Sequence, residues 1–296
     1  MGNSAQALNV KDILDISTEY LESKGIESPR LNAEWLLAHT LGKERIDLYL
    51  QFDKLLSESE KDEYRSLLKE RLNNKPLQYI IGEVDFMGIR LNVDKNVLIP
   101  RPETEQLIEK ALERLKSDNG KAFKILDVGT GSGNIAIALA KFLPAAIITA
   151  IDVSAEIIAI AKANAVKNEV ADRIEFFVHN IKSDEFTHSG YDMIISNPPY
   201  IALDTMSSLS PDIREWEPEL ALTDFADGLD MINEVIKMSM GRLNEDGLIL
   251  IEIGGNSQSD PLRKMLSEAG YSNIKIEPDY NSLARFASGV LKQHRS

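Results

Sequence analysis

The sequence predicts an α/β protein: a mostly parallel sheet of seven strands with helices on both faces, preceded by a small helical bundle and a β-hairpin. From residue 121 onward, short apolar runs of strand length alternate with stretches of helical periodicity. This alternation is typical of parallel sheets with crossover helices. Residues 1–82 show helical periodicity only, and residues 83–99 mix apolar side chains with Gly88 and Asn96, as a hairpin does.

The first 82 residues are expected to fold into three or four short helices, because their apolar side chains recur every three or four positions. Ser57 is followed three residues later by Glu60, the spacing of a capping box at a helix start. The helix breaks fall at Gly25–Pro29, Gly42 and Asn73–Pro76. The expected division of the chain is a helical domain at 1–82, a β-hairpin linker at 83–100 and an α/β domain at 101–296.

The α/β part begins with the string Leu98–Glu105, which is expected to open a helix running to about Leu115, since Pro102 and acidic residues suit a first turn. Strands are expected at 123–128, 147–152, 174–179, 191–196, 248–253, 273–278 and 284–291. Helices are expected near 133–142, 154–168, 228–243 and 258–269. Only a short turn separates the last two strands, so one strand is expected to run antiparallel.

Charge and composition exclude several classes of function. The 296 residues carry a formal net charge of −14 and have a pI of about 4.9, whereas binders of DNA or RNA usually show a basic face. With no cysteine, a disulfide framework, a thiolate nucleophile and a cysteine-ligated zinc are all impossible. The four histidines form no metal-spaced pair, so no metal site is expected: His39, His179, His188 and His294.

Nothing in the sequence predicts a secretory or membrane segment. The first ten residues have neither a basic nor an apolar signal region. The most apolar stretch, Ile135–Ile151, is short and is interrupted by Lys141 and Pro144. We therefore expect a cytoplasmic protein with no membrane partner.

The first candidate site is the glycine-rich segment Asp127–Asn134, which follows an apolar strand and opens an apolar helix. Glycines permit a tight turn and a close approach of a ligand to the backbone. The loop lies at the carboxyl end of its strand, where open α/β sheets bind ligands. Its spacing is G-x-G-x-G, which is neither the dinucleotide fingerprint nor a Walker loop. The alternative is a strand-to-helix turn that binds nothing.

Asp152 ends the next strand, 19 positions after Gly133. A carboxylate at this place is able to accept both hydroxyls of a ribose. The alternative is a turn or capping aspartate before the following helix.

Asn197-Pro198-Pro199-Tyr200 follows the fourth strand and is expected at the same edge of the sheet as the glycine loop. A plain proline-rich turn is the alternative, but the position of the tetrapeptide favours a site.

Together these motifs resemble those of the class I S-adenosylmethionine-dependent methyltransferases, which have a Rossmann-like sheet. The tetrapeptide resembles that of enzymes that methylate planar nitrogens: adenine N6, cytosine N4 or a glutamine side-chain amide. The string at 99–105 and the helical N-terminal region narrow the resemblance to the HemK/PrmC family of release factor glutamine N5-methyltransferases, over essentially the whole chain. Further matching residues are Arg214, Glu217-Pro218, Ala221-Leu222 and Asp227-Gly228-Leu229.

The resemblance implies a set of site residues, a cofactor and a partner. S-adenosylmethionine would be the methyl donor, S-adenosylhomocysteine the product, and no metal would be needed. Class I peptide-chain release factors would be the substrate, docked by the helical domain 1–82, and the enzyme would be a monomer without direct nucleic-acid contact. The cofactor-binding residues would be Gly129, Thr130, Gly131, Ser132, Gly133, Asp152, Asn180, Ile181 and Asn197. Many family members carry Asp at the position of Asn180, and some carry a larger ring at the position of Ile181.

An amide nitrogen is a poor nucleophile because its lone pair is delocalised into the carbonyl. The enzyme must therefore hold this nitrogen so that it points at the methyl group. Asn197 Oδ1 and the carbonyl of Pro198 would accept the two N–H hydrogens of the substrate, Pro199 would stiffen the segment, and Tyr200 would stack on the amide. Asn197, Pro198 and Tyr200 are thus the expected catalytic residues. No general base is needed, because the nitrogen becomes acidic once it is methylated.

Two other functions stay open at this point. One is adenine-N6 methylation of DNA or RNA, which requires base flipping and a cationic groove; both the first 85 residues and the remainder are net acidic. The other is a non-catalytic assembly or regulatory protein that retains cofactor binding. Arg101, Glu103 and Glu105 are as consistent with a structural helix start as with a pocket lid, and Trp35 and Trp216 receive no functional role.

Overall fold

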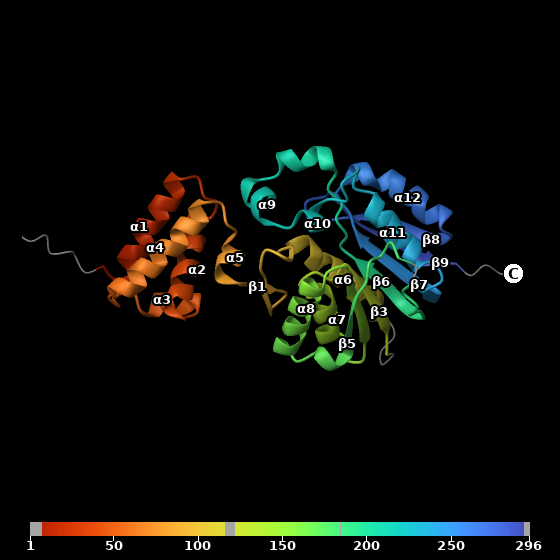
Figure 1. Cartoon of the computed structure of the whole chain (residues 1–296), viewed down its shortest axis with the longest axis horizontal. Coiled ribbons are helices and arrows are strands. Elements are labelled where there is room, and N and C mark those ends of the chain that lie inside the picture. Colours follow the sequence, from red (N-terminus) through yellow and green to blue (C-terminus); the bar gives the residue numbers. More distant parts are fainter. Residues whose placement is uncertain (1–7, 116–121, 184, 293–296) are drawn as a thin grey trace, which may run out of the picture. The chain divides into compact units, whose positions relative to one another are not determined.

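A computed structural model describes residues 8–115, 122–183 and 185–292 and divides the chain into two compact units (Figure 1). Unit 1 takes the residues up to Gly82 together with Ser210–Trp216. Unit 2 takes Glu83–Leu209 and the residues from Glu217 on. His294 lies outside the described residues.

Unit 1 is helical. Its elements are α1 (Val10–Ser23), α2 (Pro29–Leu41), α3 (Arg45–Leu50), α4 (Glu58–Leu72), α5 (Leu77–Ile81) and α9 (Pro211–Trp216). The capping box at the start of α4 is present, with Ser57 and Glu60 bonded reciprocally. Residues 8–82 thus hold five helices rather than three or four, because α3 and α5 are only six and five residues long, too short to show a clear period.

The apolar faces of these helices meet in one core built mainly from α1, α2 and α4. The α9 segment, which the sequence analysis placed with the α/β part, belongs to unit 1: the indole of Trp216 donates to the carbonyl of Asn73, 3.2 Å away. Lys75 lies 5.8 Å from the centre of the Trp216 ring. Trp216 therefore has a packing role.

The hairpin consists of β1 (Glu83–Phe86) and β2 (Ile89–Asn92), and it is anchored within unit 2. Asn164 on α8 (Ala155–Lys167) donates to the carbonyl of Asn92 and accepts from its N–H, at 2.9 and 2.7 Å. Phe86 and Leu91 are buried in the main core. These contacts hold the hairpin against α8.

The sheet of unit 2 has the strand order β5-β4-β3-β6-β7-β9-β8, and β9 runs antiparallel to both of its neighbours. This confirms the predicted α/β fold with seven strands. The strands are β3 (Lys124–Val128), β4 (Ile147–Asp152), β5 (Ile174–Val178), β6 (Tyr191–Ser196), β7 (Leu243–Glu252), β8 (Tyr271–Pro278) and β9 (Ala284–Leu291).

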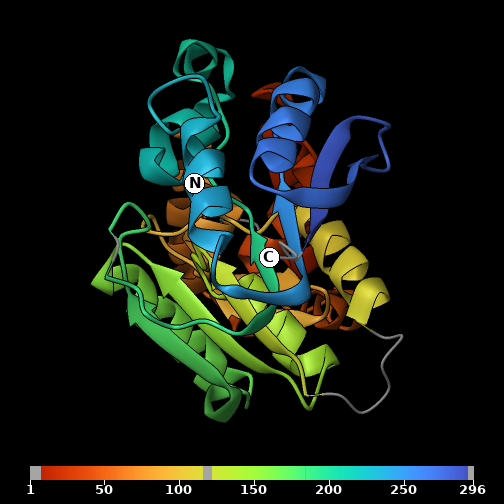
Figure 2. The same cartoon turned by 90° about the vertical axis from the view of Figure 1, so that its right-hand side faces the viewer.

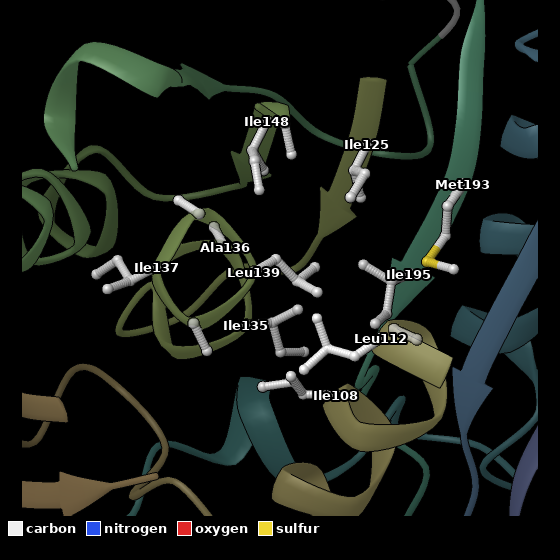
Figure 3. Packing of buried hydrophobic residues seen from close by; sticks show 14 of the residues in the cluster. Ile108, Leu112, Ile125, Ile135, Ala136, Ile137, Leu139, Ile148, Met193 and Ile195 are labelled. Carbon is white, nitrogen blue, oxygen red and sulfur yellow. The ribbon is translucent and has the colours of Figure 1, made fainter. Parts of the chain in front are cut away.

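Helices cover both faces of the sheet (Figures 1 and 2). Alternate residues of each central strand enter different cores: Ile125 packs with α6 (Pro102–Leu115) and α7 (Asn134–Phe142), and Leu126 packs with α11 (Asp230–Ser239) and α12 (Ser259–Glu268). In Figure 3, Ile135 and Leu139 of α7 lie between the strands and Ile108 of α6. The remaining short elements are α10 (Glu219–Leu222) and the 3₁₀ turns Ala171–Arg173, Leu203–Ser208 and Asn256–Gln258.

The prediction differs most from the structure around residue 241. The helix expected at 228–243 ends at Ser239, and the strand expected from 248 begins at Leu243. Gly241 adopts a φ of +75°, which stops the helix, and Leu243 already pairs with Tyr191 of β6. Among the described residues, no helix is both long enough and apolar enough to cross a membrane.

Candidate active site

The candidate site residues gather at the carboxyl edge of the five strands that run parallel. In register, Asp152 of β4 pairs with Val178 of β5, while Val128 of β3 pairs with Ser196 of β6. Ser196 in turn pairs with Ile251 of β7. The segments that follow these positions are therefore neighbours: the loop after β5, the glycine loop, the Asn197–Tyr200 segment and the end of β7.

The glycine loop presents its backbone outward and turns its side chains inward. Gly129 and Gly131 have φ values of +72° and +53°, and a Cβ at either position would meet no atom within 4 Å. Thr130 is buried, and its hydroxyl donates to the carboxylate of Asp127 at 2.6 Å. Ser132 is buried as well. The open surface over the loop is thus made of peptide groups that a ligand can approach closely.

Gly133 has a packing role. It begins α7 with a φ of +83°, and a Cβ there would lie 3.1 Å from Ile137 and 3.2 Å from Ala161. A larger residue would therefore push α7 away from α8.

Asp152 is fixed by backbone groups. Its carboxylate accepts from the N–H of Gly131 at 3.0 Å and from the N–H of Val153 at 2.8 Å. Desolvation raises the pKa of the half-buried carboxyl, and the bonds from these N–H groups and from Ser154 oppose that rise. These donors leave part of the acceptor capacity of the carboxylate unused, so it is positioned and still able to accept a hydrogen bond.

The segment after β5 lies beside this carboxylate, because the N–H of His179 donates to the carbonyl of Asp152 at 2.8 Å. Asn180 is exposed, and its Oδ1 accepts from the N–H of Lys182 at 3.0 Å. Ile181 is half-buried and packs against the core that contains α11 and α12. Asn180 thus uses one acceptor site within its own turn.

The Asn197–Tyr200 segment is held at both ends. Before it, the Ser196 hydroxyl donates to the carbonyl of Val128 at 2.7 Å, which joins it to the strand that carries the glycine loop. After it, the buried Gln258 side chain donates to the carbonyls of Tyr200 and Gly228 at 3.0 and 3.1 Å. The two ends and the two prolines between them make this segment rigid.

A glycine is required at position 228, because the backbone there lies in close contact with the Asn197–Tyr200 segment. A Cβ at position 228 would lie 2.2 Å from the carbonyl oxygen of Tyr200, and φ is +83°. A Cβ at Gly254 would lie 3.0 Å from the Tyr200 ring. Gly228, one of the residues that carry the family resemblance, therefore supports the candidate site.

A buried hydrogen-bond network links Asn197 and Tyr200. The Asn197 amide nitrogen donates to the Thr104 hydroxyl at 2.9 Å, and that hydroxyl donates to Glu252 Oε2 at 2.8 Å. The Tyr200 hydroxyl donates to Glu252 Oε1 at 3.1 Å. Within the described residues, no hydrogen bond reaches Asn197 Oδ1 or the carbonyl oxygen of Pro198.

Glu252 is fully buried at the end of β7. Burial raises the pKa of its carboxyl to about 7, even though the two hydroxyl donors and nearby Arg285 favour the ionised form. Glu103 adds a negative charge in the vicinity, which opposes ionisation. Burial and the negative charge of Glu252 also raise the pKa of Tyr200, so the tyrosine remains a hydroxyl donor.

The string at 99–105 has several different roles. Arg101 forms an ion pair with buried Glu217, which also accepts from the N–H of Ile99 at 3.3 Å. Glu105 accepts from the N–H of Met87 in the hairpin turn at 3.1 Å. These contacts are structural, while Thr104 joins the site.

Thr104, Glu252 and Gln258 support the candidate site through hydrogen bonds, and the sequence alone did not single them out. A signal for Glu252 was present: it is a lone acidic residue within the apolar run Leu248–Ile253. It ends its strand as Asp152 does. Within the described part of the chain, no group of His, Asp or Glu is arranged to hold a metal ion.

Two family models match the chain: the PrmC N-terminal domain over residues 12–82 and the methyltransferase small domain over residues 104–209. A release factor glutamine methyltransferase of Chlorobaculum tepidum is 38% identical over 283 residues, covering 94% of this chain and 95% of the relative. One from Geobacter sulfurreducens is 36% identical over 289 residues, covering 98% and 99%. The chain belongs to the release factor glutamine methyltransferase family.

Solved structures agree with the fold of this family. A methyltransferase of Pyrococcus furiosus superposes with a TM-score of 0.52 at 16% identity, covering 79% of this chain and 99% of that one. The hMettl16 catalytic domain in complex with an RNA hairpin superposes with a TM-score of 0.56 at 18% identity, covering 76% and 85%. At this identity the likeness concerns the fold alone. The expected membership of the HemK/PrmC family is confirmed by the curated relatives.

Proposed function

We propose that this protein transfers a methyl group from S-adenosylmethionine to the side-chain amide nitrogen of the glutamine in the Gly-Gly-Gln motif of class I peptide-chain release factors. S-adenosylhomocysteine would be the other product. The named relatives at 34–38% identity support the choice of substrate. The observation that carries the proposal is a pair of acceptors without internal partners, Asn197 Oδ1 and the Pro198 carbonyl oxygen, at the sheet edge that holds the glycine loop.

The residues of this chain fit the methyl donor. The open peptide groups of Gly129 and Gly131 accommodate a ligand in close contact, and Asp152 has acceptor capacity left for ribose hydroxyls. When bound, S-adenosylmethionine supplies a methyl group on a positively charged sulfur. We assign the adenine-side contacts to Asn180 and Ile181, which follow β5 next to Asp152.

The substrate amide would be oriented by the two free acceptors. A primary amide has two N–H donors, and Asn197 Oδ1 and the Pro198 carbonyl oxygen offer one acceptor to each. Such bonds strengthen as positive charge develops on the nitrogen during transfer, so they stabilise the transition state more than the ground state. The rigidity of the segment, fixed through Ser196 and Gln258, keeps both acceptors in place before the substrate arrives.

Tyr200 would cover the substrate amide and exclude water. Its ring is half-buried, its hydroxyl donates to Glu252, and its backbone carbonyl accepts from Gln258, so the residue is held both at its side chain and at its backbone. The proton leaves the nitrogen after methyl transfer, when the nitrogen is strongly acidic, and this step requires no dedicated base.

We assign docking of the release factor to unit 1. An apolar groove of about 320 Å³ lies between α1 and α4. Its lining includes Ile16 and Tyr20, which are about half exposed, and the basic residues Lys61, Arg65 and Lys69. Substituting Ile16→Ser and Tyr20→Ser together should raise KM for the intact factor and leave KM for a short Gly-Gly-Gln peptide unchanged.

We further propose that the protein is a cytoplasmic monomer that makes no direct contact with nucleic acid.

The proposed reaction is tested by methyl transfer from labelled S-adenosylmethionine. The substrates are an intact release factor, the same factor with its Gly-Gly-Gln glutamine replaced by alanine, unmethylated DNA and ribosomal RNA. Asn197→Ala should lower kcat by about 10²–10³-fold, by analogy with the loss of one hydrogen-bond donor that stabilises a transition state. The matched control is Asn233→Ala, a half-buried asparagine on α11 whose side chain makes no hydrogen bond to the described residues.

Label on the intact factor alone, lost on replacing its glutamine and strongly reduced in Asn197→Ala only, establishes both the substrate and the role of Asn197. Label on DNA or RNA with the factor untouched contradicts the proposal and points to adenine methylation. Cofactor binding without transfer to any substrate points to a non-catalytic protein.

A further inference from the structure

Asn197 has two faces that differ chemically, and the network around it determines which one is presented. An asparagine side chain carries an acceptor oxygen and a donor nitrogen of nearly equal size, so packing alone does not distinguish its two orientations. Only the orientation that presents Oδ1 accepts a hydrogen bond from a substrate N–H. Some neighbouring group must therefore select this orientation.

The Thr104 hydroxyl contacts the amide directly. It has a single proton, and that proton is donated to Glu252 Oε2 at 2.8 Å. Towards Asn197 the hydroxyl can offer only a lone pair, and the Asn197 nitrogen donates to it at 2.9 Å. The Asn197 oxygen must then point away from Thr104, where the substrate is proposed to bind.

Glu252 determines the polarity of this arrangement because an ionised carboxylate accepts hydrogen bonds and donates none. Both its oxygens are used, Oε2 by Thr104 and Oε1 by Tyr200 at 3.1 Å. Its side chain is fully buried. A buried carboxylate is costly unless it is well bonded, so its presence here calls for an explanation.

We propose that Glu252 is a positioning residue which, through the Thr104 hydroxyl, fixes the Asn197 amide with its oxygen towards the substrate. The inference rests on the proposed function. It combines three elements that are distant in sequence: Thr104 at the start of α6, Asn197 after β6 and Glu252 at the end of β7. Tyr200 is held by the second oxygen of the same carboxylate, so one buried group orders both ends of the substrate-binding segment.

Protonation of Glu252 would weaken this selection. A protonated carboxyl donates to one of the two hydroxyls, and a Thr104 hydroxyl freed from donating to Glu252 is able to donate to Asn197 Oδ1 instead. The amide would then turn its nitrogen to the substrate, where it would meet another donor. The charged and titratable groups that face Glu252 are Arg285, Glu103 and Tyr200; the charge of Arg285 is shared with Asp279, whose carboxylate lies 3.3 Å from its Nε.

The test uses four variants of the full chain: Thr104→Val, Thr104→Ser, Glu252→Gln and the double variant Thr104→Val/Glu252→Gln. Valine has nearly the shape of threonine but no hydroxyl, whereas serine keeps the hydroxyl and loses a methyl group. We expect kcat for the release factor to fall about 10²-fold in Thr104→Val, the cost of a misplaced reacting group, with KM for S-adenosylmethionine unchanged. Thr104→Ser should stay within about threefold of the wild type.

The double variant separates positioning from general support of the fold. If Glu252 acts on Asn197 through Thr104, then Glu252→Gln should lower kcat far less in the Thr104→Val background than in the wild type. Equal losses in both backgrounds would overturn the proposal. The wild-type kcat should also rise with pH as Glu252 ionises near neutrality, and this rise should be absent in Glu252→Gln.

A second readout does not depend on catalysis. In protein with ¹⁵N-labelled asparagine, the side-chain resonances of Asn197, assigned by their loss in Asn197→Ala, should shift with pH in the wild type. They should lose that dependence in Glu252→Gln and in Thr104→Val. Resonances that ignore both substitutions would refute the network. A wild-type enzyme that fails to label the release factor would instead refute the proposed function, whatever the resonances show.

Discussion

The two halves of the carboxyl edge hold their functional groups by different means. On the β4–β3 side, the candidate cofactor site is made of backbone: open peptide groups at Gly129 and Gly131, with Asp152 fixed by N–H groups. On the β6–β7 side, the candidate substrate site is made of side chains that hold one another, from Asn197 through Thr104 to Glu252. The first half is local in sequence, while the second joins residues up to 148 positions apart.

This difference has a chemical reason. The cofactor is large and offers many groups, so a loop of the right curvature provides most of what it needs. The substrate amide is small and must be oriented to within a fraction of an ångström at the nitrogen. Such accuracy requires a buried network in which each member has one possible orientation, at the cost of burying a carboxylate.

The largest expected effect comes from breaking the support of the substrate half. Gly228→Ala places a Cβ 2.2 Å from the Tyr200 carbonyl oxygen and must displace the Asn197–Tyr200 segment. We expect kcat to fall by about 10²-fold or more, with the affinity for S-adenosylmethionine within about threefold of the wild type.

The control for this substitution is Gly241→Ala. Gly241 also has a left-handed φ, +75°, but a Cβ there meets no atom within 4 Å. It should therefore cost only about 1–2 kcal/mol of stability from backbone strain and leave kcat intact. Equal losses of kcat in the two variants would show that strain, and not displacement of Tyr200, is responsible.

The cofactor half should respond in a different kinetic constant. Asp152→Asn removes a charged acceptor from the Gly131 and Val153 N–H groups and from the proposed ribose contact. The loss of about 1.5–3 kcal/mol expected for hydrogen bonds to a charged group should raise KM for S-adenosylmethionine by about 10–100-fold, with a smaller change in kcat. Asp172→Asn, an exposed aspartate in the turn before β5, is the matched control. A loss confined to kcat would place Asp152 in the substrate half.

The sequence alone was informative about these two halves to different degrees. The strand–glycine loop–helix unit and the position of Asp152 were predicted correctly because consecutive residues determine a turn and its strand. The position of the Asn197–Tyr200 segment was also correct, since it follows a strand of clear apolar pattern. Their roles in binding remain predictions.

The partners of Asn197 escaped the sequence analysis. The bond between Thr104 and Glu252 depends on how β7 and α6 pack, and no local pattern records that distance. Glu252 did leave a trace, as an acidic residue at the end of an apolar strand, but such a residue is also common at strand ends that face solvent. The helical boundary near Gly241 was missed for a similar reason, because the strand pairing of Leu243 overrides local helical periodicity.

Stability measurements sharpen the comparison, since a side-chain network with a buried carboxylate should be costly to the fold. The folded-state pKa of Glu252 is about 7, against an ordinary value of 4.5. Between these pH values the folded protein binds more protons than the unfolded one, so the free energy of unfolding falls as pH rises and stays low above pH 7.

We therefore expect Glu252→Gln to gain stability over the wild type on going from pH 5 to pH 8, by at most about 3 kcal/mol. Burial also raises the pKa of Asp127 to about 7, but Asp127 is present in both proteins, so its contribution cancels in the difference. The difference in the free energy of unfolding is measured by denaturant unfolding at several pH values. Glu245→Gln, at an exposed position of β7, is the matched control. A flat difference for Glu252→Gln would mean that the carboxylate imposes no cost.

The smallest expected effect lies at the outer end of the cofactor half. Asn180 is exposed, and one of its acceptor sites is already used by the N–H of Lys182. Asn180→Asp keeps that bond and replaces a neutral acceptor with a charged one towards the adenine amino group. The gain of a charge-assisted bond at an exposed position is about 0.5–1 kcal/mol, so KM for S-adenosylmethionine should fall by about two- to fivefold with kcat unchanged. Asn180→Ala should raise KM for S-adenosylmethionine by a similar factor, and the control Asn233→Asp should leave it unchanged. If Asn180→Asp instead weakens the binding of the cofactor, the new charge faces another acceptor. The cofactor contact made by the loop after β5 would then come from its backbone, as in the glycine loop.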